Sequence, residues 1–268
     1  MEPFDFSDRA VFVAGGTSGI NLGIAKAFAS RGANVAVASR SAERVASAVK
    51  ELQGHGGKAI GQAADVRDAS AIAGALAAAH AAFSDIDVLV SGAAGNFPAA
   101  ALGMSTNAFK SVIDIDLLGT FNVMHAAHRF LRKPGAAIVN ISAPQAVHPV
   151  AMQAHVCAAK AGVDMLTRVL CLEWGGDGIR VNSVIPGPIA DTEGMARLAP
   201  TEAARAEVRA AVPLARMGTR EDVANLVMFL ASPLAAYISG AVIPVDGGWS
   251  AAGVGGLTHI LAAAAQRA

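Results

Sequence analysis

Apolar positions along the chain fall into two patterns, short buried runs and longer segments with helical spacing. We predict strands at the short runs: Val11–Val13, Asn34–Ser39, Lys58–Ala63, Asp87–Ser91, Ala137–Ser142, Ile179–Ile185 and Ala241–Val245. We predict helices between them: a first helix ending at Arg31-Gly32, then Ala42–Leu52, Ala69–Phe83, Thr106–Leu131, Met152–Trp174, Glu202–Ala211 and Glu221–Ala231. Apolar strands that alternate with helices indicate an α/β fold with a parallel sheet covered on both faces. In such a fold a ligand binds at the carboxyl ends of the strands.

Composition narrows this picture to a globular protein without a nucleic-acid partner. The chain has 268 residues and no Pro/Ser-rich linker, so we expect one domain over residues 1–268. The mean hydropathy is +0.45, yet no apolar run is long enough to cross a bilayer, and we predict no membrane insertion. The formal charge is zero without a Lys/Arg cluster, which argues against nucleic acid. Two cysteines in no metal-ligand spacing predict no metal site, and Met1–Asp8 does not resemble a signal peptide, so we expect a cytoplasmic protein.

A glycine-rich turn follows the first strand and opens the first helix. This arrangement binds a pyrophosphate, because main-chain N–H groups and the positive end of the helix dipole face the anion. Glycine spacing alone also occurs at ordinary turns, but here it opens the first βα unit of a long alternating chain. We expect cofactor contacts at Gly15, Thr17, Ser18, Gly19, Ile20 and Asn21.

Further landmarks come in the order found in one large enzyme family. These landmarks are the glycine turn, Asp65-Val66, the Gly92–Gly95 loop, Lys160 on a long helix, Pro186-Gly187 and Asp246-Gly247-Gly248. From about Arg9 to Gly248 the chain therefore resembles a short-chain dehydrogenase/reductase. The resemblance implies a single Rossmann-like, doubly wound sheet and a homotetramer built on the two long helices. It also implies a substrate lid at about residues 190–212.

The cofactor preference can be argued at the end of the second strand. A carboxylate there would bind the ribose hydroxyls of NAD, but this chain has Ser39-Arg40 and no acid before Glu43. A guanidinium can pair with a 2′-phosphate, which favours NADPH, although Arg40 could also be an ordinary surface arginine at a helix start. The family resemblance implies further cofactor contacts at Asp65, Val66, Gly92, Ala93, Ala94, Lys160, Pro186, Gly187, Ile189 and Thr192.

Departures from the family pattern are concentrated at the catalytic positions. Most members have a Tyr four residues before the lysine, where this chain has Val156; the usual Ser is Ala143 and the usual Asn is Asp116. The single tyrosine, Tyr237, is far along the chain and does not take over this role. In the glycine turn Asn21 replaces the last glycine, where it either hydrogen-bonds the cofactor or caps the helix.

This pattern resembles one branch of the family, the peroxisomal type of 2,4-dienoyl-CoA reductase and its bacterial relatives. The matching stretches are AAGNF (93–97), DIDLLGTFNV (114–123), AHVCAAKAGVDMLTRVLCLEW (154–174), GIRVNSVIPGPIADTEGMARL (178–198) and SPLAAYISGAVIPVDGG (232–248). The resemblance implies that Lys160, Asp164 and Asp116 replace the tyrosine machinery. Val156, Lys160 and Asp164 recur every four residues and so share one helix face. Alternatively, Lys160 and Asp164 form an exposed helix pair worth about 0.3–0.5 kcal/mol.

The chemistry of a dienoyl thioester suits a site without tyrosine. Hydride adds at the far end of the conjugated system, and negative charge develops at the thioester oxygen, where hydrogen-bond donors stabilise it. A ketone instead requires an acid that protonates the alkoxide at once. We expect the acyl group near Asn96, Phe97, Met195 and Leu198. Two other interpretations stay open: a related reductase acting on trans-2-enoyl-CoA or β-ketoacyl thioesters, and a catalytically silent NADPH-binding protein.

Overall fold

The computed structural model describes residues 4–252, apart from the side chains of residues 197 and 198. Seven strands form one parallel sheet in the order β3-β2-β1-β4-β5-β6-β7. The strands are β1 (Ala10–Ala14), β2 (Asn34–Ser39), β3 (Ala59–Ala63), β4 (Val88–Ser91), β5 (Ala137–Ile141), β6 (Arg180–Pro186) and β7 (Val242–Val245). The doubly wound fold predicted from the sequence is confirmed.

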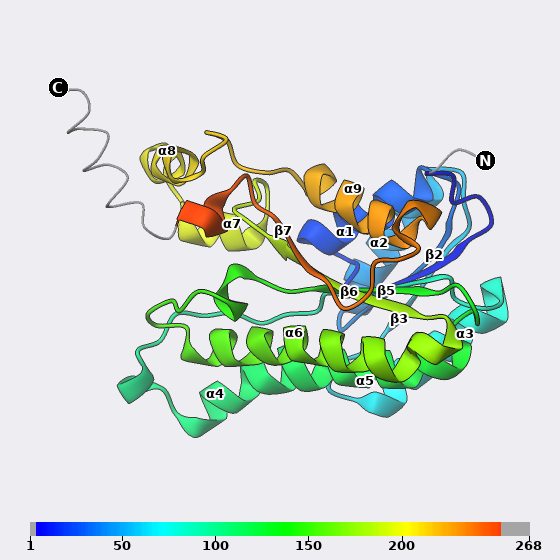
Figure 1. Cartoon of the computed structure of the whole chain (residues 1–268). Coiled ribbons are helices and arrows are strands. Elements are labelled where there is room, and N and C mark those ends of the chain that lie inside the picture. The colour runs from blue at the N-terminus through cyan, green and yellow to red at the C-terminus, as the bar shows by residue number, and fades with distance from the viewer. Residues whose placement is uncertain (1–3, 253–268) are drawn as a thin grey trace, which may run out of the picture.

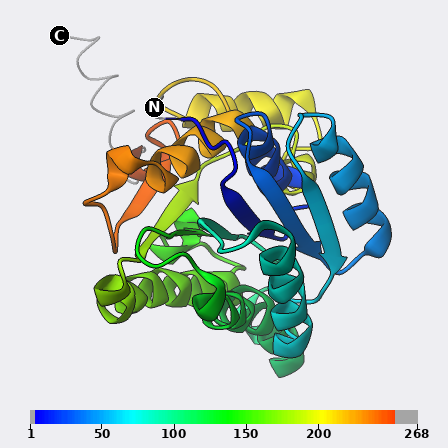
Figure 2. The ribbon, with the colours of Figure 1, turned by 90° about the vertical axis from the view of Figure 1, so that its right-hand side faces the viewer.

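Helices cover both faces of the sheet, as Figures 1 and 2 show. The α-helices are α1 (Gly19–Ala29), α2 (Ala42–Gln53), α3 (Ala69–Phe83), α4 (Thr106–Val112), α5 (Gly119–Ala127), α6 (Ala154–Trp174), α7 (Glu193–Leu198), α8 (Glu202–Ala211) and α9 (Arg220–Ala231). One layer contains α1, α2 and α9, and the opposite layer contains α3, α5 and α6 (Figure 1).

Alternation along the strands explains why both faces are covered. In β1, Val11 and Val13 pack into the cluster under α1 and α9, whereas Phe12 and Ala14 pack into the cluster under α3 and α5. The neighbouring strands follow the same rule, because successive side chains of a strand point to opposite faces. Each strand must therefore be apolar at nearly every position, which is the pattern that the sequence contains.

The predicted helix Thr106–Leu131 is helical from Thr106 to Phe130, but it is not one regular α-helix. A π-helical segment, η2 (Ile113–Leu118), separates α4 from α5, and the N–H of Gly119 donates to the carbonyl of Asp114, five residues back. A 3₁₀ turn, η3 (His128–Phe130), ends the run before Leu131 adopts an extended conformation. Asp116 lies in this segment and is buried, and π-bulges of this kind are frequent at functional sites.

The second long helix begins two residues later than predicted, at Ala154 rather than Met152. Met152 has a φ of 65°, which is incompatible with a right-handed helix. The other predicted boundaries differ from the structure by a few residues at most. Helix α7 was not predicted as a separate element; it begins the segment that follows β6, and α8 continues it.

Candidate active site

Loops that carry most of the predicted site residues gather at the carboxyl edge of the sheet, because all seven strands run in the same direction. The glycine turn follows β1, Arg40 follows β2, Asp65 follows β3, and the Gly92–Gly95 loop follows β4. The residues after β6 reach the same edge, and Lys160 projects towards it from α6, where it bonds the last residue of β5. The order of strands thus brings together segments that are far apart in the sequence.

The glycine turn has the features that an anion at a helix terminus requires. Gly15 and Gly19 have φ values of 77° and 56°, and Ser18 precedes α1 without capping it through its side chain. The first N–H groups of α1 therefore have no side-chain acceptor at the cap. Gly16, which was not predicted, is needed for packing, because a Cβ there would lie 2.8 Å from Val37. Its position as the second of two adjacent glycines after β1 was the available clue.

Asn21 neither caps α1 nor projects into open space. Its Nδ2 donates to the carbonyl of Gly92 over 2.7 Å, so the side chain joins α1 to the loop after β4. The alternative that Asn21 caps the helix is therefore wrong, because the N-cap is Ser18 and the Asn21 amide instead contacts a distant segment. The loop itself continues through Ala93 and Ala94, which are partly exposed and exposed.

Charged side chains follow both β2 and β3 and lie near one another. Arg40 is exposed, whereas Ser39 is partly buried. Asp65 binds the guanidinium of Arg67 through both carboxylate oxygens, and these hydrogen bonds hold the pKa of Asp65 below its ordinary value. Arg40 lies near enough to lower that pKa further. Sequence reasoning missed Arg67, although its position two residues after Asp65 was visible.

Val66 is buried against the helix that follows η2. Its carbonyl accepts a hydrogen bond from Asn122 Nδ2 over 2.9 Å, and a Cβ on Gly119 would lie 2.6 Å from its side chain. This contact fixes the end of β3 next to α5. Val66 is only 7% exposed.

Lys160 and Asp116 form a buried ion pair. Lys160 Nζ lies 3.4 Å from Asp116 Oδ2 and donates to the carbonyl of Ile141 over 3.1 Å. The other oxygen of Asp116 accepts a hydrogen bond from the Gly95 N–H over 2.7 Å. Asp116 therefore connects η2, α6 and the loop after β4, and the interpretation of Lys160 as an exposed helix residue is wrong.

Asp164 shares the buried face of α6 with Lys160, as the spacing predicted, but its carboxylate is directed elsewhere. Oδ1 accepts a hydrogen bond from Ser183 Oγ on β6 over 3.0 Å. Burial raises the pKa of Asp164, and the hydroxyls of Ser142 and Ser183 only partly offset the effect. The exposed-pair alternative is wrong for this residue too, because Asp164 is 2% exposed.

The position of the customary tyrosine is filled by a buried aliphatic side chain. Val156 packs against Val112 and Ala159, so no hydroxyl is present one turn before Lys160. Ala143 follows β5 and likewise brings no hydroxyl. Tyr237 is fully exposed in the segment that leads into the start of β7, at the opposite edge of the sheet. The expectation that Tyr237 does not substitute is consistent with this place.

The first turn of α6 contacts the loop after β4. His155 is completely buried, and its ring centroid lies 4.5 Å from that of Phe97. Neither ring nitrogen of His155 has a hydrogen-bond partner. Gln153 Nε2 donates to Asn96 Oδ1 over 3.3 Å, so Asn96 and Phe97 both lie against the start of α6. Sequence reasoning did not identify Gln153 or the burial of His155.

The residues after β6 lie on the other side of the carboxyl edge of the sheet. A Cβ on Gly187 would lie 2.6 Å from Asp246, so Pro186-Gly187 packs directly on the turn after β7. Ile189 is buried in the core, and its carbonyl accepts a hydrogen bond from Thr192 Oγ1. Thr192 caps α7 by accepting from the Met195 N–H, and Met195 is 9% exposed. The side chain of Leu198 lies outside the described residues.

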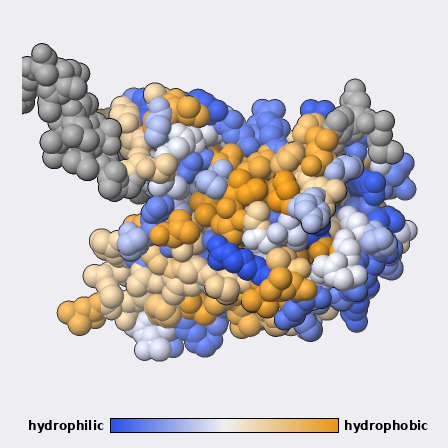
Figure 3. All heavy atoms as spheres, in the orientation of Figure 1, coloured by the Kyte–Doolittle hydropathy of each residue, from blue (hydrophilic) through white to orange (hydrophobic). Residues whose placement is uncertain are grey.

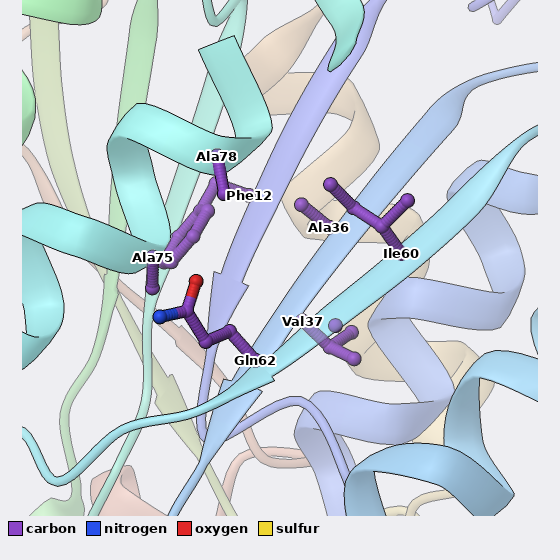
Figure 4. A pocket seen from close by; sticks show the side chains of 8 residues that line it. Phe12, Ala36, Val37, Ile60, Gln62, Ala75 and Ala78 are labelled. Carbon is purple, nitrogen blue, oxygen red and sulfur yellow. The ribbon is translucent and has the colours of Figure 1, made fainter. Parts of the chain in front are cut away.

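Two hollows in the described part of the chain lie away from this edge. The cavity of about 30 Å³ in Figure 4 lies between β1, β2, β3 and α3, lined by Phe12, Gln62 and Ala75 among others, and is too small for a nucleotide. A groove of about 730 Å³, lined in part by Arg9, Asp87 and Arg180, lies at the amino ends of the strands.

Within residues 4–252 no cluster of three His, Cys, Asp or Glu could hold a metal ion. None of the helices in that range is long and apolar enough to cross a membrane.

Comparison with known proteins gives one consistent result. Residues 14–250 match the family described as enoyl-(acyl carrier protein) reductase. The chain is 45% identical to the peroxisomal 2,4-dienoyl-CoA reductase of Pongo abelii, over 90% of this chain and 83% of that protein. It is 41% identical to a probable 2,4-dienoyl-CoA reductase of Bacillus subtilis, over 90% of this chain and 96% of that protein. A putative short-chain alcohol dehydrogenase from Sinorhizobium meliloti 1021 superposes with a TM-score of 0.87 at 32% identity, covering 93% of this chain and 99% of that one.

Proposed function

Because the chain belongs to the short-chain dehydrogenase/reductase family, we propose that it reduces a conjugated double bond of a 2,4-dienoyl-CoA thioester with NADPH. The observation that carries this proposal is the buried Lys160–Asp116 pair beside Val156, where the customary tyrosine is missing. A site without that hydroxyl lacks the acid that ketone reduction requires but keeps a cation for stabilising developing negative charge.

The residues at the carboxyl edge of the sheet fit a nicotinamide dinucleotide. The uncapped start of α1 suits a pyrophosphate, and the exposed Arg40 suits a 2′-phosphate. Asp65 and Val66 would lie by the adenine, and Pro186, Ile189 and Thr192 by the nicotinamide half. When bound, the cofactor supplies the hydride. NADPH in preference to NADH stays a proposal that rests on Arg40.

Lys160 has two tasks in the proposed mechanism. Its ammonium binds the nicotinamide ribose hydroxyls, and its charge lowers the energy of the negative charge that develops at the thioester oxygen after hydride addition. Asp116 keeps the ammonium in place through their ion pair, and the two groups together order the water that protonates the acyl chain. Asp164, bonded to Ser183, positions the middle of α6 against β6.

The acyl group is proposed to lie between the loop after β4 and the segment 190–212. Asn96 and Phe97 contribute one side through their contacts with α6. The nearly buried Met195, together with Leu198, would contribute the other, with the segment acting as a lid. The position of the double bond left in the product is open, because the relatives above are named for different products. The protein of Pongo abelii is named for (3E)-enoyl-CoA and that of Bacillus subtilis for (2E)-enoyl-CoA.

A homotetramer is proposed from the apolar surface of α5 and α6. Figure 3 shows apolar residues spread over the face on which these helices lie. Leu118, Phe121, Met165, Val169 and Leu172 are exposed there. Contiguous apolar surface of this kind marks an interface between chains.

The cytoplasmic location expected from the sequence stays a prediction, since several eukaryotic relatives are named as peroxisomal proteins.

Steady-state turnover tests the function. Oxidation of NADPH is followed with dienoyl-CoA, trans-2-enoyl-CoA and β-ketoacyl-CoA in parallel, and dienoyl-CoA is expected to react fastest. A faster reaction with β-ketoacyl-CoA would overturn the proposal in favour of a carbonyl reductase. Binding of NADPH without turnover of any of the three would favour the catalytically silent alternative.

A further inference from the structure

Asn21 stands where two loops of the proposed cofactor site meet. It lies in the first turn of α1, and its Nδ2 donates to the carbonyl of Gly92, a residue 71 positions further along the chain. The bond therefore joins the glycine turn after β1 to the loop after β4. These are two of the segments between which a dinucleotide would bind.

The contact leaves no room for a side chain at residue 92. A Cβ built on Gly92 would lie 2.2 Å from Asn21 Oδ1 and 2.6 Å from Nδ2, distances that Cβ atoms do not adopt. Gly92 has no positive φ that would demand glycine. Its lack of a side chain is therefore explained by the neighbouring amide rather than by backbone conformation.

The glycine turn is held by the same amide. A Cβ on Gly15 would lie 3.0 Å from the main chain of Ala93 and 3.2 Å from Asn21 Nδ2. Gly15 has a φ of 77°, so the turn also needs glycine for its conformation. Asn21, Gly15 and Gly92 thus pack directly against one another, so a larger side chain at either glycine would displace the Asn21 amide.

One atom of the amide has no partner. Asn21 Oδ1 is buried and accepts no hydrogen bond. A Cβ built on Gly92 would lie 2.2 Å from this oxygen, so the oxygen faces Gly92 and is closed to solvent. The hydrogen bond to the Gly92 carbonyl is therefore what holds the amide in place.

We propose that Asn21 is a positioning residue for the dinucleotide: it fastens the glycine turn to the loop after β4, and the missing side chain of Gly92 makes room for it. The proposal rests on the cofactor site proposed above. It explains how a residue with a side chain stands at the family's last glycine position without closing the site.

A double-mutant cycle tests the fastening. Gly92→Ala should weaken NADPH binding about tenfold, since the new methyl group displaces the amide. Asn21→Gly should weaken it by a similar factor through loss of the hydrogen bond. The double variant, in which the methyl group has room, should bind NADPH better than the product of the two single effects predicts. Gly176→Ala is the matched control, because a Cβ there meets no atom within 4 Å.

Two further measurements separate this role from simple stabilisation. Asn21→Gly should raise the KM for NADPH with little change in kcat, as expected when binding is lost equally in ground and transition states. Asn21→Leu keeps the bulk but loses the amide, so it should weaken NADPH binding and should not rescue Gly92→Ala.

The results of the double-mutant cycle can be told apart from a failure of the proposed function. Coupling in the melting temperature of the cofactor-free protein but none in NADPH affinity would overturn the positioning role. Independent effects in both measurements would overturn the fastening itself. A wild type that does not bind NADPH would overturn the proposed function and the cofactor role together, whereas turnover with an uncoupled cycle would overturn only the inference.

Discussion

Lys160 Nζ lies 3.4 Å from Asp116 Oδ2, and both side chains are almost completely buried, at 5% and 1% exposed. Removing one partner of such a pair leaves the other charge buried without compensation. Asp116 also accepts the Gly95 N–H, so the pair couples the position of the lysine to the loop after β4. This relationship makes Asp116 the most direct test of the proposed mechanism.

Asp116→Asn should lower turnover of a 2,4-dienoyl-CoA by about 10²-fold, because Lys160 and the water proposed beside it would lose their anchoring charge. Lys160→Ala should abolish turnover. Steady-state kinetics with saturating NADPH measures both effects. The control is Lys110→Ala, which removes an exposed ion pair with Asp114 on the same helical run. Unimpaired turnover in Lys160→Ala would rule out the proposed role of the lysine.

Asp164 should make stability depend on pH in a defined direction. Burial raises its pKa in the folded state above the ordinary value of 3.8, so the folded protein binds the proton more tightly than the unfolded chain does. The stability contributed by this residue therefore falls as pH rises from about 3.8 through the raised folded pKa. Asp164→Asn, which carries no such charge, should melt at a higher temperature than wild type at neutral pH.

The advantage of Asp164→Asn should shrink as the pH is lowered through the raised pKa of folded Asp164, because wild-type Asp164 then becomes neutral. Melting temperatures measured across this range provide the test. Glu173→Gln changes an exposed acid on the same helix and should have little effect at any pH. A stability advantage of Asp164→Asn that grows on acidification would contradict the assigned direction.

Arg40→Asp should weaken NADPH binding far more than NADH binding. The change removes a cation that pairs with the 2′-phosphate and adds a charge that repels it, and together these effects should amount to about 10²-fold or more. Titration of both cofactors by fluorescence measures the ratio. Arg31→Asp, an exposed arginine after α1, should leave the ratio unchanged. A wild type that prefers NADH would refute the cofactor assignment.

Assembly should depend on one stripe of α6. Met165, Val169 and Leu172 recur at helical spacing and are 55%, 39% and 81% exposed, on the side of the helix that faces away from the sheet. Leu172→Glu should shift the proposed tetramer to smaller species, because a buried, unpaired charge opposes association. Light scattering at micromolar concentration reports the change, with the fully exposed Leu102→Glu as control. A wild-type monomer at that concentration would disprove the interface.

The sequence by itself determined the layers of the fold and the position of the lysine. Strands such as β1 are apolar at every position because both faces are covered, and that pattern can be recognised without knowledge of distant contacts. The four-residue spacing of Val156, Lys160 and Asp164 likewise placed them on one helix face, where the structure has them buried.

Only the tertiary structure decided which groups these side chains contact. Whether Lys160 pairs with Asp116 or Asp164 depends on the π-helical segment and on the approach of β6, and neither follows from local spacing. Asn21 was visible as a departure, but its partner Gly92 is distant in sequence and became its neighbour only through the parallel pairing of β1 with β4. Periodicity is a local property of the chain, whereas hydrogen bonds and ion pairs between segments exist only after the whole sheet has assembled.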